Sequence, residues 1–253
     1  MKLFESRWRA FGAHLCVSML VAALAACLVF GLWYPYPYRD VSGGRELFVL
    51  MAGVDVVIGP LITLIIFNKA KKPQRELLRD MVCIAVLQMA ALAYGLWTVA
   101  LARPVHLVFE YNRFTVVHAA QLSKEALSLV PRELVATPWT GPTALGLRPF
   151  RSQKEQMDAT MDALQGAPLA ARTDLWQSFD ASRQALRAAA KPMADLKQRT
   201  PQASPLIDAW LANSGRTLGE LSYVPLVGRK TFWTVVLDAQ TADILGYLPI
   251  DSF

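Results

Sequence analysis

Three apolar stretches of about 20 residues each lie within the first hundred residues and constrain the fold of this chain more than any other feature. They cover roughly residues 13–33, 47–67 and 81–101, and their only acidic side chain is Asp55, with no Lys or Arg. At 1.5 Å of rise per residue, a helix of this length crosses the roughly 30 Å hydrocarbon core of a bilayer. A helix in a soluble protein normally keeps one polar face. The sequence therefore predicts an integral membrane protein with the lipid bilayer as one partner.

The residues after Arg103 differ in composition and predict a second domain. They mix polar and apolar side chains, and about 150 residues are enough for one ordinary hydrophobic core. We expect a transmembrane domain at residues 1–103, built as a three-transmembrane-helix N-terminal bundle. We expect a C-terminal α+β domain at residues 104–253, with a small antiparallel sheet.

Local patterns predict the elements of the C-terminal domain. β-branched and apolar runs between turn residues are typical of strands, and Ser-capped amphipathic segments are typical of helices. Residues 137–149 are rich in Pro and Gly and predict a loop. Predicted strands cover residues 105–110, 114–118, 221–227, 231–237 and 244–248, and predicted helices cover residues 123–129, 152–165, 173–190 and 206–211.

The distribution of basic residues predicts the topology. The net charge is +6, and basic side chains gather before the first apolar stretch and between the second and third. Basic residues near membrane ends are retained in the cytoplasm. We therefore expect a multi-pass protein of the bacterial inner membrane with a cytoplasmic N-terminus and a periplasmic C-terminal domain. That domain has no clustered basic surface, which argues against a nucleic-acid partner.

The motifs of common enzymes are missing from the sequence. It contains no GxGxxG, P-loop, GxSxG or HExxH pattern, and its three cysteines all lie in the apolar stretches. We therefore expect no enzyme activity, no cofactor and no metal site. A three-residue loop at Tyr111–Arg113 would place His106 opposite His118, but a third metal ligand is not evident and a one-residue register change would separate the two. Surface or half-buried histidines are the favoured interpretation.

Asp55 is the candidate functional residue of the membrane domain. It lies near the middle of the second apolar stretch, where a charge costs several kcal/mol. Pro60 removes the backbone hydrogen bond to the carbonyl of Val56, and Gly59 allows a neighbouring helix to approach the resulting kink. One interpretation is a protonated carboxyl that hydrogen-bonds to Gln88 or Thr98. The other is a contact with a partner or a proton path, and the residues alone leave both open.

Two further features of the N-terminal half admit two interpretations each. Ser18, Ala22 and Ala26 form a small-residue stripe that allows close helix packing, either within this protein's own bundle, which is favoured, or against a partner's helix. The segment Tyr34–Tyr38 alternates Tyr with Pro. It is expected to anchor the chain at the level of the lipid headgroups, with a recognition strip as the alternative.

Three segments resemble a known family. They are residues 47–67, residues 77–80 together with Gln88 and residues 93–99, and residues 103–114. Over roughly residues 47–117 the chain resembles the type IV pilin accessory proteins of the TfpX/TfpZ family. The resemblance implies a chaperone-like, non-enzymatic protein that assists a cognate type IV major pilin in stability, assembly or surface display. It supplies no catalytic residues.

A pilin waiting in the membrane as one apolar helix with an external head could be contacted at two places. Two linked weak contacts gain strength through effective concentration. Our hypothesis is that Asp55, Gly59 and Pro60 form the contact inside the membrane while the periplasmic domain holds the head. The alternative is a membrane-tethered periplasmic sensor, which would need a cytoplasmic partner because the cytoplasmic segments are short. Neither the pilin, the step assisted nor the oligomeric state follows from the residues.

Overall fold

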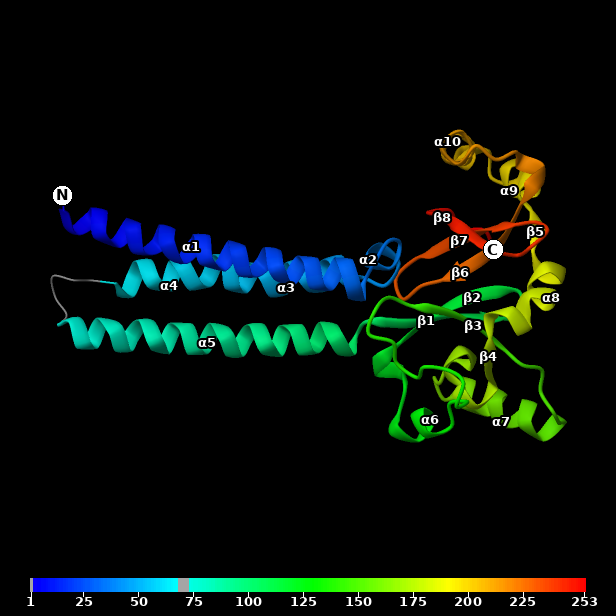
Figure 1. Cartoon of the computed structure of the whole chain (residues 1–253), viewed down its shortest axis with the longest axis horizontal. Coiled ribbons are helices and arrows are strands. Elements are labelled where there is room, and N and C mark those ends of the chain that lie inside the picture. Colours follow the sequence, from blue (N-terminus) through cyan, green and yellow to red (C-terminus); the bar gives the residue numbers. More distant parts are fainter. Residues whose placement is uncertain (1, 68–72) are drawn as a thin grey trace. The chain divides into compact units, whose positions relative to one another are not determined.

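The apolar stretches form long helices in the computed structural model of the chain, which describes residues 2–67 and 73–253 (Figure 1). Within the described residues, three helical segments are long and apolar enough to cross a membrane: Arg7–Trp33, Gly44–Ile66 and Gln74–Leu101. This confirms the predicted three-helix N-terminal part. Residues 68–72, in the basic loop expected on the cytoplasmic side, lie outside the described residues.

The chain divides into two compact units. Unit 1 contains residues 1–35 and 44–102, and unit 2 contains residues 36–43 and 103–253. The helices of unit 1 are α1 (Lys2–Leu28), α3 (Gly44–Gly53), α4 (Gly59–Ile66) and α5 (Gln74–Leu101), with two π-helical turns, η1 (Val29–Trp33) and η2 (Val54–Ile58). The second membrane-length helix is therefore continuous in α3, η2 and α4, with a π-helical turn at its centre.

Unit 2 is built on a mixed sheet. The strands are β1 (Pro104–Glu110), β2 (Arg113–His118), β3 (Thr143–Leu147), β4 (Trp176–Ser178), β5 (Lys191–Pro192), β6 (Leu221–Val227), β7 (Phe232–Asp238) and β8 (Ile244–Leu248). They are ordered β4-β3-β1-β2-β6-β7-β8, and β5 pairs with β6. Most pairs are antiparallel, but β1 with β3 and β2 with β6 are parallel. The α+β prediction is confirmed, whereas the sheet is mixed rather than purely antiparallel.

Helices flank the strands in sequence. They are α2 (Tyr38–Val41), α6 (Lys124–Ser128), α7 (Gln153–Leu164), α8 (Phe179–Ala189), α9 (Met193–Arg199) and α10 (Ser204–Ser214), with the short 3₁₀ turns η3 (Ala119–Gln121), η4 (Leu169–Ala171), η5 (Thr173–Leu175), η6 (Pro201–Ala203) and η7 (Leu218–Glu220). Three of these helices, α6, α7 and α8, are capped by a Ser side chain. The Ser123 and Ser152 hydroxyls accept hydrogen bonds from the first turns of α6 and α7.

The helix predicted at residues 173–190 is wrong in its first third, where η5 and β4 precede α8. The predicted loop 137–149 contains β3, whose pairing partners are distant in sequence.

The hairpin at β1 and β2 has a tighter turn than expected. Glu110 pairs with Arg113, so the loop contains two residues, and Tyr111 at φ 52° is its first central residue. Positive φ at that position is the pattern of a type II′ turn, which matches the twist of antiparallel strands. His106 consequently pairs with Val117 rather than with His118, and the predicted opposition of the two histidines is wrong.

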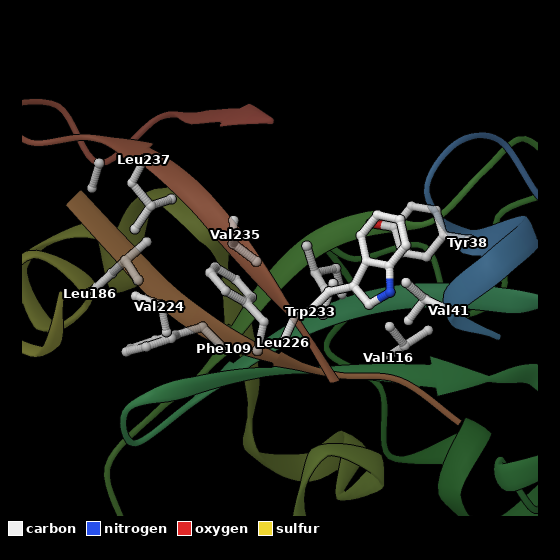
Figure 2. Packing of buried hydrophobic residues seen from close by; sticks show 13 residues of the cluster. Tyr38, Val41, Phe109, Val116, Leu186, Val224, Leu226, Trp233, Val235 and Leu237 are labelled. Carbon is white, nitrogen blue, oxygen red and sulfur yellow. The ribbon is translucent and has the colours of Figure 1, made fainter. Parts of the chain in front are cut away.

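The core of unit 2 includes a segment from between the first two membrane-length helices. Tyr38 and Val41, on α2, are buried in the cluster that contains Val116, Trp233 and Val235 (Figure 2). The Tyr38 hydroxyl lies 3.1 Å from the hydroxyl of Tyr247.

The approach of α2 to the hairpin of β6 and β7 depends on a glycine. The backbone N–H of Lys230 donates to the carbonyl of Val41 over 3.2 Å. A Cβ at Gly228 would lie 2.0 Å from a methyl group of Val41, so only glycine leaves room for this contact.

The prediction of a headgroup anchor at Tyr34–Tyr38 is therefore wrong for its two ends. Tyr34 is buried in unit 1 and Tyr38 in unit 2. Tyr36 is about half exposed, with its ring 6.0 Å from that of Trp233.

Replacing Val41 by Ala tests the packing of α2 on the sheet. Val41 is fully buried, so removing two methyl groups leaves a cavity, and we expect unit 2 to lose about 2 kcal/mol of unfolding free energy. Val135→Ala, at an exposed Val of the same unit, is the control and should change little. Urea unfolding of the full chain in detergent, read by protease susceptibility of the C-terminal part, measures both. Equal stability of the two variants would contradict the packing.

Acidification should weaken unit 2 through His118. Burial holds the pKa of this imidazole down to about 4, against about 6.5 in an unfolded chain. Between these values the unfolded chain binds a proton that the folded unit does not, so stability falls as the pH falls. From about pH 7 to about pH 5 the expected loss is about 2 kcal/mol in the same unfolding assay. His118→Gln should flatten this dependence, and an unchanged slope in that variant would contradict the assignment.

Candidate intramembrane binding site

The backbone around Asp55 is π-helical. In η2 each carbonyl faces the N–H five residues later rather than four. The partner position of the Asp55 carbonyl in this pattern is Pro60, whose nitrogen carries no hydrogen. The sequence predicted the loss at the Val56 carbonyl, as in an α-helix, and this prediction is wrong. The π-helical turn moves it to Asp55 itself.

Gln88 of α5 supplies the hydrogen bond that Pro60 cannot. Its side-chain amide Nε2 donates to the Asp55 carbonyl over 3.2 Å. The contact requires glycine at position 59, because a Cβ there would lie 1.9 Å from the same Nε2 atom. Gly59 therefore admits a polar side chain of the neighbouring helix, which agrees with the close approach expected from the sequence.

His14 and Thr63 extend this contact across the unit. The His14 ring nitrogen Nε2 lies 2.6 Å from Gln88 Oε1, and Nδ1 lies 2.6 Å from the Thr63 hydroxyl. Because Gln88 uses an N–H group on Asp55, its oxygen accepts from His14 Nε2. In the tautomer with its hydrogen on Nε2, the Nδ1 atom of His14 accepts from the Thr63 hydroxyl. We call Thr63, His14, Gln88 and the Asp55 carbonyl the polar chain. It joins α4, α1, α5 and η2, with one donor for each acceptor.

The Asp55 carboxyl is left outside the polar chain. Asp55 is 8% exposed, and its Oδ1 atom has no hydrogen-bond partner among the described residues. Gln88 contacts the backbone carbonyl instead, and the Thr98 hydroxyl donates to Tyr94 of its own helix. The structure therefore pairs the Asp55 carboxyl with neither Gln88 nor Thr98, the two partners that the sequence suggested.

A cavity of about 260 Å³ lies beside this carboxyl, within unit 1. Its lining residues come from η2, α4 and α5, and most of them are apolar: Val54, Asp55, Ile58, Gly59, Ile62, Ile66, Cys83, Ile84, Leu87, Gln88 and Ala91. We call it the Asp55 pocket. A site of this kind can hold an apolar group that carries a hydrogen-bond donor, because an ionised carboxylate only accepts.

The small-residue stripe of α1 is mostly used within the bundle. Ser18 is buried, and Ala22 and Ala26 are half-buried. Helix α1 packs on α4 and η2 of the same unit. Small side chains at such a contact let two helices approach closely in lipid.

His14 is the residue of this site that the sequence analysis missed. A polar signal was present, because His14 is the only imidazole in the three apolar stretches. Its partners Thr63 and Gln88 lie 49 and 74 residues away, so no local spacing connects them.

Unit 2 carries a second concave feature at the tip of the β1–β2 hairpin. Two hollows of about 320 and 350 Å³ share Tyr111, Phe150 and Leu169 among their lining residues. Tyr111 combines 65% exposure with a positive φ that L-residues rarely adopt. We call this feature the hairpin groove.

Among the described residues, no group of three or more His, Cys, Asp or Glu side chains is placed to hold a metal ion. The buried His106 has protein partners on both nitrogens. Nδ1 lies 2.8 Å from the Thr143 hydroxyl, and Nε2 lies 2.9 Å from the Ala136 carbonyl.

Gly59→Ala tests the polar chain. The added Cβ displaces the Gln88 amide and breaks its hydrogen bonds to Asp55 and His14, so we expect unit 1 to lose about 1–2 kcal/mol. Gly53→Ala is the matched control, because a Cβ there meets nothing within 4 Å. Thermal unfolding of the purified protein in detergent compares them, and equal midpoints would show that Gln88 is not held as described.

The comparisons with known proteins give a consistent result. A family model described as Fimbrial assembly protein FimB matches residues 2–43. A Fimbrial assembly protein of serogroup I from Dichelobacter nodosus is 34% identical over 245 residues, covering 96% of this chain and 94% of the relative. The serogroup E1 protein of that organism is 31% identical over 244 residues, again covering 96% and 94%.

A third relative from Dichelobacter nodosus, a Fimbrial assembly protein of serogroups C1 and C2, is 39% identical over 116 residues, which are 46% of this chain and 88% of the relative. No solved structure matches. The similarity to the first two relatives extends over nearly the whole length of both chains. The chain therefore belongs to the fimbrial assembly protein family.

Proposed function

We propose that this protein assists a cognate type IV major pilin in stability, assembly or surface display, as an accessory protein of the TfpX/TfpZ kind. Its membership of the fimbrial assembly protein family supports a role in building a fimbria rather than in catalysis. The three apolar helices support a role at the membrane, where a pilin waits before assembly. The action is chaperone-like: the protein binds the pilin and changes no covalent bond.

The proposed location is the bacterial inner membrane, with the N-terminus in the cytoplasm and unit 2 in the periplasm. The basic residues near the first helix and between the second and third support this orientation. The packing of residues 36–43 in unit 2 is consistent with three spans, whichever side unit 2 faces. The loop between the first two spans and the C-terminal domain share one core, so they must lie on the same side of the membrane, as three spans require.

The Asp55 pocket is the observation that carries the proposal. A buried carboxyl oxygen without a partner is costly in hydrocarbon, and polar groups at such depth are normally paired. The polar chain stabilises the bundle without using this carboxyl. We propose that Asp55, with Gly59 and Pro60 shaping the π-helical turn, contacts the transmembrane helix of the pilin.

Two further surfaces complete the proposed contact. On α1, Ala22 and Ala26 keep part of their surface outside the bundle and can meet the same partner helix, whereas Ser18 is buried within the unit. In unit 2, the hairpin groove offers apolar walls and the exposed ring of Tyr111 to the pilin head. Membrane and periplasmic contacts on one partner strengthen each other by effective concentration.

Substitutions at Asp55 test this function in cells. We expect Asp55→Leu to lower surface piliation strongly while the protein level stays unchanged, because the variant packs but offers no acceptor to the pilin. Asp55→Asn keeps one acceptor oxygen and should lower piliation less. Thr98→Val is the control, since its hydroxyl bonds only within α5. Normal piliation in both Asp55 variants, at normal protein level, would show that the pocket is not the site of action.

A further inference from the structure

We propose that the Asp55 pocket recognises a cationic hydrogen-bond donor, an amino or guanidinium group carried by a partner's transmembrane helix. This inference rests on the proposed function, because it assumes that a helix docks at this pocket. It adds the chemistry of the group that the helix must present.

No donor among the described residues is hydrogen-bonded to Oδ1 of Asp55. Gln88 donates to the Asp55 carbonyl, His14 donates to Gln88, and the Thr63 hydroxyl donates to His14. Each side chain of the polar chain therefore has a partner other than the Asp55 carboxyl. Oδ1 of Asp55 remains without one in the described part of the chain, although the residue is more than nine-tenths buried.

An ionised Asp55 also needs a counter-charge. The apolar stretches at residues 13–33, 47–67 and 81–101 contain this acid and no Lys or Arg. No Lys or Arg of these stretches can therefore supply the counter-charge for an ionised Asp55, and we assign that charge to the partner helix. A neutral donor would satisfy the oxygen but leave the charge in hydrocarbon, whereas a cation does both, and charge-assisted hydrogen bonds are about twice as strong as neutral ones.

The form of the Asp55 pocket suits a long basic side chain. Its walls are largely apolar, and its volume of about 260 Å³ gives room for the aliphatic stem of a long basic side chain. Such side chains bury their methylene groups along apolar surface and bring only the charged head to a polar partner. The lining residues Ile62, Ile66 and Leu87 provide that surface, and the carboxyl is the only acidic group among the lining residues.

A native cysteine makes the pocket accessible to cross-linking. Cys83 lines the Asp55 pocket and is exposed on the helix surface, as are Cys16 and Cys27 of α1. The full chain with Cys16→Ala and Cys27→Ala keeps one thiol at the pocket. Its control keeps Cys27 alone, because that residue is not among the pocket-lining residues.

The experiment mixes each single-cysteine protein with synthetic transmembrane peptides in phosphatidylcholine vesicles. The peptides are Leu/Ala helices with one cysteine and, one turn away at the centre, a Lys, a Ser or a further Leu. Oxidation with copper phenanthroline traps neighbouring thiols as a disulfide. We expect the Lys peptide to cross-link to Cys83 about tenfold more than the Leu peptide does, because the pocket binds the Lys side chain selectively. Cys27 should show no such preference.

Variants of Asp55 complete the test. Asp55→Leu should remove the preference for the Lys peptide, and Asp55→Glu should retain it, because the carboxylate and its charge are kept. Equal yields with the Lys and Ser peptides would overturn the cationic assignment in favour of a neutral donor. Equal yields with all three peptides would overturn any polar recognition. Neither result decides whether the pilin binds at this pocket, because the piliation assay tests that contact separately. The two proposals can therefore fail independently.

Discussion

The hydrogen bond from Gln88 to the carbonyl of Asp55 is the interaction on which the membrane unit depends. Pro60 leaves this carbonyl without a backbone donor, and an unsatisfied carbonyl in hydrocarbon costs several kcal/mol. The side chain of Gln88 is held in place by His14, and His14 by Thr63. The members of the polar chain therefore satisfy one another, while the Asp55 carboxyl stays available for a partner.

Unit 2 depends in the same way on a segment that is remote in sequence. Residues 36–43 lie between two membrane-length helices, yet Tyr38 and Val41 are buried against β2 and β7. Gly228 leaves the space that Val41 fills. A C-terminal fragment that begins at Pro104 would lack this segment and expose the apolar surface of Trp233, so unit 2 is complete only as part of the full chain.

The elements that the sequence predicts correctly are those set by local patterns. Three apolar stretches predict three long helices, and the apolar runs at residues 221–227 and 244–248 predict β6 and β8. Strand β3 was missed because Pro and Gly flank it and its register is set by β1 and β4. The one-residue error in the β1–β2 turn has a similar cause, since Tyr111 adopts a backbone conformation usually left to Gly.

The candidate site could be predicted only in part. A lone acid beside Gly59 and Pro60 was visible as an anomaly, but the π-helical turn depends on packing against α5, and the role of His14 on contacts across 49 and 74 residues.

Double-mutant cycles on unit 1 stability test the arrangement most directly. His14→Leu and Gln88→Leu should couple by about 0.6–1.7 kcal/mol, whereas Asp55→Leu and Gln88→Leu should be additive, because Gln88 contacts only the backbone of Asp55. Strong coupling between Asp55 and Gln88 would mean that the carboxyl is already paired inside the protein, and it would contradict the account.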